Sequence, residues 1–416
     1  MSDTACWPRP PPASRGCRRH ERAPSATDDV APVLIGLAIS WPIVINIVLP
    51  AIPAIGDAFG TTPDRVQFAF SMGMMAFGFA QFVIGPMIDR FGRRPVMLAA
   101  LVIFCTGSNV GALAPGMPVV TLGRVVQCAG VAALFVIARV IIRDLYKGAR
   151  AGQAMSRLAT SITVGPMVTP ILGGIIVSAL GWRYTFGFAA LYALALLAWC
   201  WRSAGETQPQ GERGGMSLAV LKTQYRVLFT DPVFISYVLA ATCISNGFFT
   251  VMLLTPVLFI KDFGVSPAVF GFCVIGMTCG LMAGGFHATR RVMRLGVDGI
   301  IARGLTVSSL ALLLLALTPW PSLPLVIIPA CLYMYGHGMA FPNSMAASTD
   351  VDPRVVGAAT ATLASVSQLL IGLLTSVSAR WHDGTGLPLA TICLASNLLA
   401  WAAFTRARRL KAERRA

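Results

Sequence analysis

Apolar runs of about 20 residues recur along nearly the whole chain, and this is the length of a helix that crosses a lipid bilayer. Lipid offers no water to the backbone, so each run must form a helix to satisfy its own hydrogen bonds. Charged residues make up only 12% of the chain, about half the fraction in an ordinary soluble domain. The sequence therefore predicts an all-α polytopic membrane protein.

We expect twelve spans in two sets of six, separated by one long polar stretch. The predicted domains are an N-terminal six-helix bundle over 30–202, a cytoplasmic linker over 203–232 and a C-terminal six-helix bundle over 233–405. Within the linker, 216–228 is predicted to form a short helix on the membrane surface. The spans are expected at 31–52, 67–86, 95–114, 119–142, 156–180, 183–202, 233–259, 268–288, 299–318, 323–346, 357–378 and 386–404.

The distribution of basic residues predicts the orientation. With the N-terminus inside, the outer connections hold only four basic residues, and the inner connections and the tails hold most of the others. Inner loops carry this excess in membrane proteins, so both termini are predicted to be cytoplasmic. Residues 1–29 are rich in Pro and Arg and predict a disordered tail, while 406–416 form a basic tail. We expect the first apolar run to stay as a signal anchor.

Several classes of function are not supported by the sequence. The net charge of +16 could indicate a nucleic-acid partner, but such proteins concentrate their cations on a soluble face. The ten cysteines show no metal or disulfide spacing. We find no phosphate-binding loop, no HExxH motif and no GxSxG elbow. We therefore expect a protein that is not an enzyme, with no cofactor, no metal site and no nucleic-acid partner.

One charged connection occurs in both sets of spans. The segment Gly85 to Leu98, between the second and third spans, reads GPMIDRFGRRPVML. A weaker version, GFHATRRVMRLG, covers Gly285 to Gly296 in the matching connection of the second set. The glycines permit a tight turn, and two parallel six-helix repeats would leave this pattern.

The first of these connections matches the signature loop of the major facilitator superfamily. Over about 30–405 the chain resembles the Bcr/CflA type of drug:proton antiporter within that superfamily. The other segments that carry the resemblance are Leu49 to Pro53, Gln81, Arg124, Gln127 and Gly130, Arg143 to Tyr146, Pro166, Pro170, Gly173 and Gly174, Gly181 to Arg183, Phe341 to Asn343, and Gly357 to Ala359.

The resemblance implies a major facilitator fold, with two six-helix bundles related by a pseudo-two-fold axis. It implies a monomeric secondary active transporter of the bacterial inner membrane that exports drugs or amphipathic small molecules by alternating access with proton exchange. An importer or facilitator on the same fold, and a non-transporting sensor, stay open as alternatives. The resemblance assigns coupling or gating roles to Asp89, Arg90, Gly92, Arg93, Arg94, Arg124, Asp144, Pro166, Pro170, Gly173 and Gly174.

The chain departs from this family at the expected proton carrier. No acidic residue lies in the middle of a predicted span, and Asn46 stands where the group usually has an Asp. An amide cannot carry a proton near neutral pH. His337, between two glycines, is a candidate replacement because histidine titrates in the right range. A neutral histidine bonded to a backbone carbonyl is the alternative.

We expect the substrate pocket between the bundles, near the middle of the bilayer. A cation there would need a counter-charge, so we predict a neutral or zwitterionic amphipathic substrate over a strongly cationic one. A charge within an apolar helix is usually functional, although Arg124 could instead reach toward the membrane surface. For each aromatic residue, lipid or core packing is an equal alternative. The predicted lining residues are Asn46, Arg124, Asn246, Phe248, Phe249, Tyr333 and His337.

Overall fold

The computed structural model describes residues 30–146, 148–207, 230–317, 323–348, 356–378 and 387–414. Regular structure within these residues is helical, as the sequence predicts. The predicted tail 1–29 and the predicted surface helix 216–228 lie outside the described residues.

The first group of helices corresponds to the first six predicted spans. Its first span is broken, because Pro50 has no N–H to donate to the carbonyl of Asn46, one helical turn earlier. The helices are α1 (Val30–Asn46), the 3-10 turn η2 (Leu49–Ala51), α2 (Ile52–Ala58), α3 (Pro63–Phe91), α4 (Arg93–Ala112), α5 (Met117–Leu145), α6 (Gly148–Ala179) and α7 (Arg183–Ser203).

The second group contains a helical pair that carries one label. α10 spans 51 residues, but it consists of two helices joined at a kink, because the backbone of Gly296, with φ at 68°, is not helical. The two parts correspond to the eighth and the ninth predicted spans. Among the described residues, ten helices are long and apolar enough to cross a membrane. The group comprises α9 (Pro232–Pro256), which continues as the π-helical turn η4 (Val257–Asp262), then α10 (Pro267–Leu317), α11 (Leu323–Ser348), α12 (Val356–Ser378) and α13 (Leu387–Glu413).

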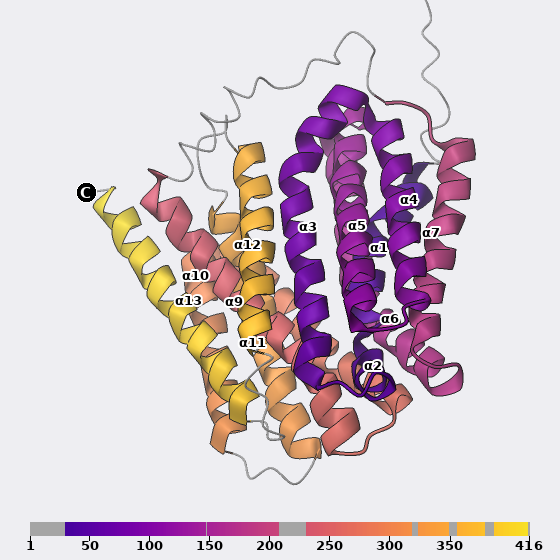
Figure 1. Ribbon diagram of the computed structural model, residues 1–416. Coiled ribbons are helices and arrows are strands. Elements are labelled where there is room, and N and C mark those ends of the chain that lie inside the picture. Colours follow the sequence, from indigo (N-terminus) through magenta and orange to yellow (C-terminus); the bar gives the residue numbers. More distant parts are fainter. Residues whose placement is uncertain are drawn as a thin grey trace, which may run out of the picture.

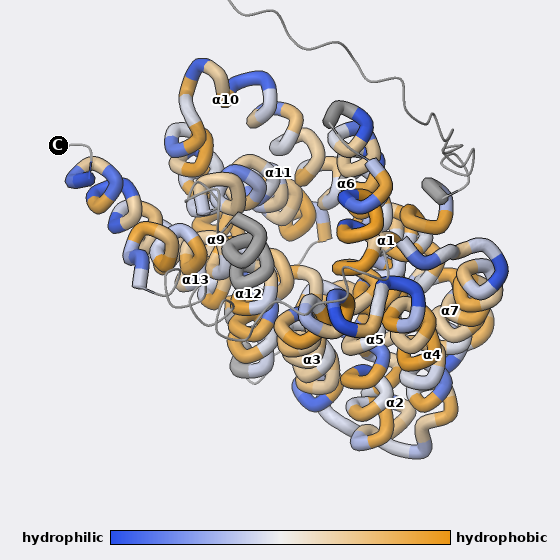
Figure 2. Tube along the Cα trace, turned by 90° about the horizontal axis from the view of Figure 1, so that it is seen from above, coloured by the Kyte–Doolittle hydropathy of each residue, from blue (hydrophilic) through white to orange (hydrophobic). Residues whose placement is uncertain are grey.

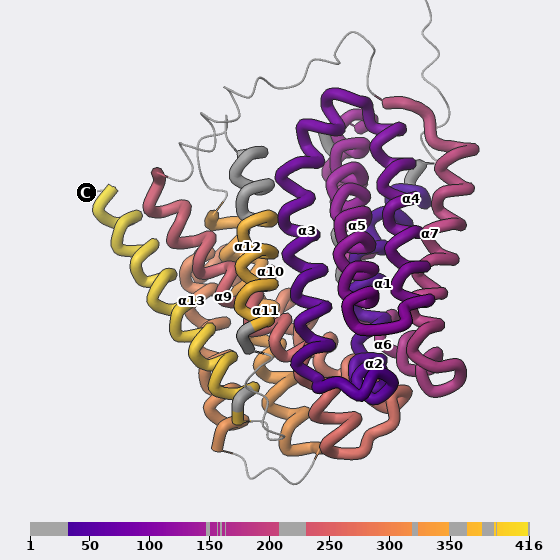
Figure 3. Tube along the Cα trace, in the orientation of Figure 1, coloured from indigo at the N-terminus to yellow at the C-terminus, as the bar shows by residue number. Residues whose placement is uncertain are grey.

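The two groups form two bundles that meet along two seams. One seam packs α3 against α12, and the other packs α6 against α10. α12 comes from near the C-terminus, yet it lies beside α3 from near the N-terminus (Figure 3). Viewed from above, α4 and α7 lie on the far side of the first bundle and α13 on the far side of the second (Figure 2). This arrangement leaves α1 and α5 across from α9 and α11, between the seams.

Both seams are built on small residues. A methyl group added to Gly78 of α3 would lie 2.9 Å from the backbone nitrogen of Leu369 in α12. In the other seam, a methyl group at Gly174 of α6 would collide with the backbone carbonyl of Pro267. Small residues let helix backbones approach this closely in membranes, where lipid supplies no hydrophobic drive for packing.

The contacts between the bundles are strongest at the end that carries α2, which we call the α2 end. There a single apolar cluster contains Ile52 and Val48 of the first bundle with Leu253 and Phe259 of the second. The amide of Gln67 also donates to the carbonyl of Leu253 across 3.3 Å. Toward the opposite end, which we call the Gly92 end, α9 and α13 diverge from α3 (Figure 1). The bundles are therefore closed against each other at the α2 end.

Candidate transport site

The predicted lining residues come from the four helices that lie between the seams. Asn46 ends α1 and Arg124 lies in α5, while Phe248 belongs to α9 and His337 to α11. In Figure 2, α1 and α5 face α9 and α11, with the α3–α12 seam on one side and the α6–α10 seam on the other. These side chains divide into a polar group and an aromatic group.

The polar group is centred on Arg124. Its side chain is fully buried, and its Nη1 donates to the backbone carbonyl of Val44 in α1 at 2.9 Å and to Oε1 of Gln127 at 2.8 Å. Gln127 in turn donates to the hydroxyl of Ser108 at 2.9 Å. The guanidinium carbon lies 4.4 Å from the ring centre of Phe70 in α3, a cation–π distance. Arg124 therefore ties α5 to α1 and α3 and does not reach the membrane surface.

The positive charge of Arg124 has no acidic partner among the described residues. Its Nε and Nη2 atoms are buried and form no hydrogen bond there. Asn46 lies on the same helix as the carbonyl that Arg124 contacts, but the amide of Asn46 donates to its own helix, at the carbonyl of Pro42, 2.9 Å away. An uncompensated charge in an apolar interior is costly, so this arrangement needs a functional explanation.

The aromatic group is a stack in the second bundle. The ring of His337 lies between Phe248, 4.9 Å away at 22°, and Phe341, 5.3 Å away at 13°. Phe249 packs edge-on against Phe248 at 5.2 Å. His337 is 5% exposed, bonds to the backbone carbonyl of Ile244 and keeps its Nδ1 without a partner in the described chain. This is the geometry of a carbonyl-bonded histidine, the alternative considered for this residue.

Two predicted residues pack inside the second bundle instead of toward the first. The amide of Asn246 donates to the hydroxyl of Ser396 in α13, 2.8 Å away, on the far side of the bundle. Tyr333 is 4% exposed, and its hydroxyl packs against Gly247. The structure thus brings Phe248, Phe249 and His337 together, keeps Asn46 and Arg124 together in the other bundle, and leaves Asn246 and Tyr333 in the core.

A second cation within a span was missed in the sequence. Arg139 lies in α5, half-buried, with its guanidinium carbon 4.1 Å from the ring centre of Phe135. Phe135 contacts Phe77 of α3 at 6.0 Å, and Phe77 contacts Trp41 of α1 at 3.7 Å. The signal was available, because Arg139 falls within the predicted span 119–142.

The signature connection forms a charge network at the Gly92 end. Arg93 lies 3.6 Å from Asp89 of α3, and its Nε donates to Asp144 of α5 at 2.9 Å. Gly92 turns the chain with φ at 94°, a conformation that favours glycine. Arg90 is exposed and lies 5.4 Å from the ring centre of Phe91. The network joins three helices of the first bundle.

Glu206 completes this network and was not predicted. Its carboxylate accepts from the backbone N–H groups of Arg93 and Arg94, at 3.0 Å and 3.3 Å. These N–H groups begin α4, where a carboxylate satisfies free donors and complements the helix dipole. Arg94 also donates to the carbonyl of Trp201 at 3.0 Å. The stretch after α7 therefore holds the start of α4 in place.

The prolines and glycines of α6 lie where the bundles meet. Pro166 and Pro170 fall inside the helix, and each removes one backbone hydrogen bond. Gly173 faces the carbonyl of Ile47, just after α1, whereas Gly174 faces Pro267 of the second bundle. One face of α6 thus supports α1, and the next residue forms the seam.

Residues 34–375 match the family model described as the Major Facilitator Superfamily. The chain belongs to this superfamily. The match confirms the fold class expected from the sequence, and the paired bundles with their two seams agree with it.

Among its relatives in this superfamily are two bacterial resistance proteins. The chain is 26% identical over 354 residues to a chloramphenicol resistance protein of Pseudomonas aeruginosa, covering 83% of each chain. It is 23% identical over 369 residues to a bicyclomycin resistance protein homolog of Haemophilus influenzae, covering 86% of this chain and 92% of the relative. These matches agree with the resemblance to the Bcr/CflA group.

A solved major facilitator structure shares the fold. It is a bacterial homolog of the human lysosomal transporter Spinster, in an inward-facing and unoccupied conformation. The TM-score is 0.73 at 17% identity, over 93% of this chain and 98% of that chain. At this identity the likeness concerns the fold alone.

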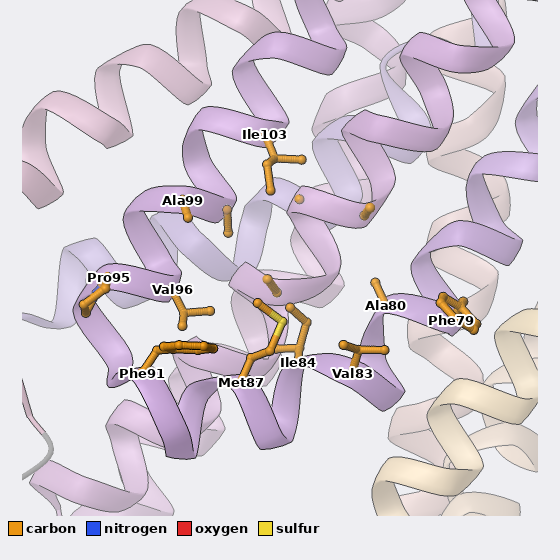
Figure 4. Close-up of a pocket in the computed structure, with 14 residues that line it drawn as sticks. Phe79, Ala80, Val83, Ile84, Met87, Phe91, Pro95, Val96, Ala99 and Ile103 are labelled. Carbon is orange, nitrogen blue, oxygen red and sulfur yellow. The ribbon is translucent and has the colours of Figure 1, made fainter. Parts of the chain in front are cut away.

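An apolar groove lies away from the boundary between the bundles. It has a volume of about 490 Å³ and is lined by residues of α3, α4 and α5, among them Phe79, Met87, Phe91 and Ile103 (Figure 4). These four side chains are exposed, and apolar side chains exposed on a membrane protein contact lipid tails. The groove contains none of the predicted lining residues, so it is separate from the candidate transport site.

Proposed function

We propose that this major facilitator protein exports drugs or other amphipathic small molecules across a bacterial inner membrane by alternating access. The observation that carries the proposal is the closure at the α2 end, where Gly174 packs against Pro267 across the bundles. Such a close contact between small, uncharged groups of the two bundles can open and close without separating a pair of charges. The names of the resistance relatives support drugs as substrates.

The proposed orientation places the Gly92 end in the cytoplasm. Arg90, Arg93 and Arg94 lie at this end, and cytoplasmic connections carry the excess of Lys and Arg. The C-terminal residues Arg408 and Arg409 lie near the end of α13 on the same side (Figure 1). With this orientation the closed α2 end faces outward, which supports an inward-facing state.

Proton exchange is proposed to involve His337. Among the described residues inside the spans, acidic side chains lie only at helix ends, and Asn46 is bonded to its own helix. The Nδ1 of His337 has no partner among the described residues, and the ring belongs to the aromatic group of the second bundle. The other ring nitrogen of His337 is bonded to the carbonyl of Ile244. It keeps this bond during the transport cycle unless the ring turns.

A facilitator on the same fold is the second candidate. Asn46 favours it, because an amide in place of the usual carboxylate removes the family's proton carrier. The two candidates differ in whether a proton gradient drives accumulation.

The test is uptake of labelled chloramphenicol into inside-out proteoliposomes with an acidic lumen. Uptake that collapses with the gradient, and that is lost in His337→Ala but kept in His287→Ala, would establish proton-driven export through His337. Uptake that only equilibrates would establish the facilitator. If a panel of amphipathic drugs gives no uptake by the parent protein, the transporter proposal fails.

A further inference from the structure

Arg139 lies within α5 of the first bundle and meets no counter-charge among the residues that the structure describes. Within the part of the chain that the structure describes, it forms no hydrogen bond or ion pair, and its one close polar interaction is with the face of Phe135 at 4.1 Å. Arginine stays charged in proteins. A face of an aromatic ring compensates only a small part of that charge.

The charge balance of the interior is positive. The described acidic residues lie at helix ends, in connections or, for Asp298, beside the kink of α10; they are Asp57, Asp64, Asp89, Asp144, Glu206, Asp231, Asp262, Asp298 and Glu413. Two arginines, Arg124 and Arg139, lie within α5, and neither meets a carboxylate in the described residues. Two charges of one sign in a low-dielectric interior attract an anion strongly.

The surroundings of Arg139 extend to the boundary between the bundles. From Phe135 the aromatic contacts continue through Phe77 to Trp41. Trp41 and Phe249 pack against one small cluster formed by Ile45, Met74 and Ile371, which come from α1, α3 and α12. Arg139 is therefore connected to the same aromatic surface that carries Phe249 and the His337 stack.

We propose that Arg139 is an anion-binding residue of the transport site, and that the preferred substrates are organic anions in which a carboxylate is joined to an aromatic body. This inference rests on the proposed function. The guanidinium binds the carboxylate through paired N–H donors, and the ring packs among Trp41, Phe135 and Phe249. Two interior arginines repel cations and attract anions. The proposed substrates are therefore organic anions, in place of the neutral or zwitterionic molecules expected from the sequence.

The test compares two probes with one ring system and different charge. Purified protein in nanodiscs is titrated with 2-naphthoate and with 2-naphthylmethanol, and the ratio of their dissociation constants is measured by calorimetry. The parent protein is expected to prefer the carboxylate by about tenfold or more, since a hydrogen bond to a charged group has this effect when desolvated. Arg139→Gln is expected to bring the ratio to about one, and Arg139→Lys to an intermediate value, because Lys lacks the paired donors.

The control is Arg303→Gln, since Arg303 is an exposed arginine of α10, and it should leave the ratio as in the parent. Equal affinities in the parent, or a preference that survives in Arg139→Gln, would overturn the inference. The comparison in the parent decides the matter even if Arg139→Gln fails to fold. Chloramphenicol transport by the parent reports on the proposed function separately: transport without a carboxylate preference removes only the anion site.

Discussion

The two bundles share their backbone frame and differ in their interiors. Each turns between its second and third span on a glycine with positive φ, Gly92 at 94° and Gly296 at 68°. Inside, the first bundle holds Arg124 and Arg139, whereas the second holds the stack of His337 between Phe248 and Phe341. Backbone sterics favour glycine where φ is positive, so both repeats keep a glycine at this turn. The interior side chains are not constrained in this way, so they can differ between the bundles: the first carries two arginines and the second a stacked histidine.

The largest effect is expected from breaking the seam that both bundles build. In Gly174→Val, the new side chain collides with the carbonyl of Pro267, and overpacking a tight contact costs about 3 kcal/mol. Because the clash exists only when the α2 end is closed, we expect transport to be lost and the α2 end to become accessible. Cysteine labelling near Ile52 measures this accessibility.

Gly187→Val is the matched control for the seam. A methyl group at Gly187 of α7 meets no atom within 4 Å, so this variant should transport and label like the parent. If Gly174→Val also labels like the parent, the α6–α10 seam is not the closing contact.

A smaller effect is expected from the polar group of the first bundle. Gln127→Ala removes an acceptor from buried Arg124 and a donor from Ser108, and leaving such groups unpaired lowers the free energy of unfolding by about 2 kcal/mol. Gln153→Ala, at an exposed position of α6, should leave stability unchanged. Titration with a denaturing detergent measures both. Equal stability of the two variants would mean that the bonds of Gln127 to Arg124 and Ser108 contribute nothing measurable to the free energy of unfolding.

The smallest effect is expected from removing the ion pair between Asp231, at the start of α9, and Arg414, which follows α13. Partial burial alone would raise the pKa of Asp231, but the ion pair with Arg414 at 2.7 Å and the N–H groups of Val233 and Phe234 outweigh it and lower this pKa. A lowered pKa stabilises the fold above the unfolded value, about 4, and the gain is lost as the pH falls further. Asp231→Ala should cost about 1 kcal/mol at pH 7.

The same variant tests the pH dependence. As the pH falls through the lowered pKa of Asp231 in the folded parent, its carboxylate becomes protonated, and the difference in thermal stability between parent and variant should shrink. A difference that stays constant across this range would show that the carboxylate charge contributes nothing to the start of α9.

Much of the fold could be predicted because hydrophobic length is a local signal. The spans, the turn at Gly92 and the small residues of α6 could all be read in the sequence. The break inside α10 could be read as well, because the non-helical Gly296 separates the two spans expected there. Long-range contacts were out of reach: Glu206 meets the start of α4 more than a hundred residues away.

The candidate site was predicted less well than the fold. A side chain in a span shows its residue type in the sequence but not the face on which it lies. Asn246 therefore seemed a lining residue, although it bonds to Ser396 on the far side of its bundle. Arg139 was missed, although an arginine inside a predicted span is by itself a sign of a functional residue. His337 was predicted as a site residue from its residue type and its flanking glycines, but its stacking on two phenylalanines depends on α9 and α11 meeting.

The two ends of the molecule are held by different forces, so they should respond differently to dissolved salt. At the α2 end the bundles meet through glycine and apolar side chains, and these contacts carry no charge that dissolved ions could screen. At the Gly92 end Asp89, Arg93 and Asp144 interact through charges that are partly exposed, and ions screen such charges over about 8 Å at physiological strength. Added salt is therefore expected to weaken the ion pairs within the first bundle at the Gly92 end without screening the contacts between the bundles at the α2 end.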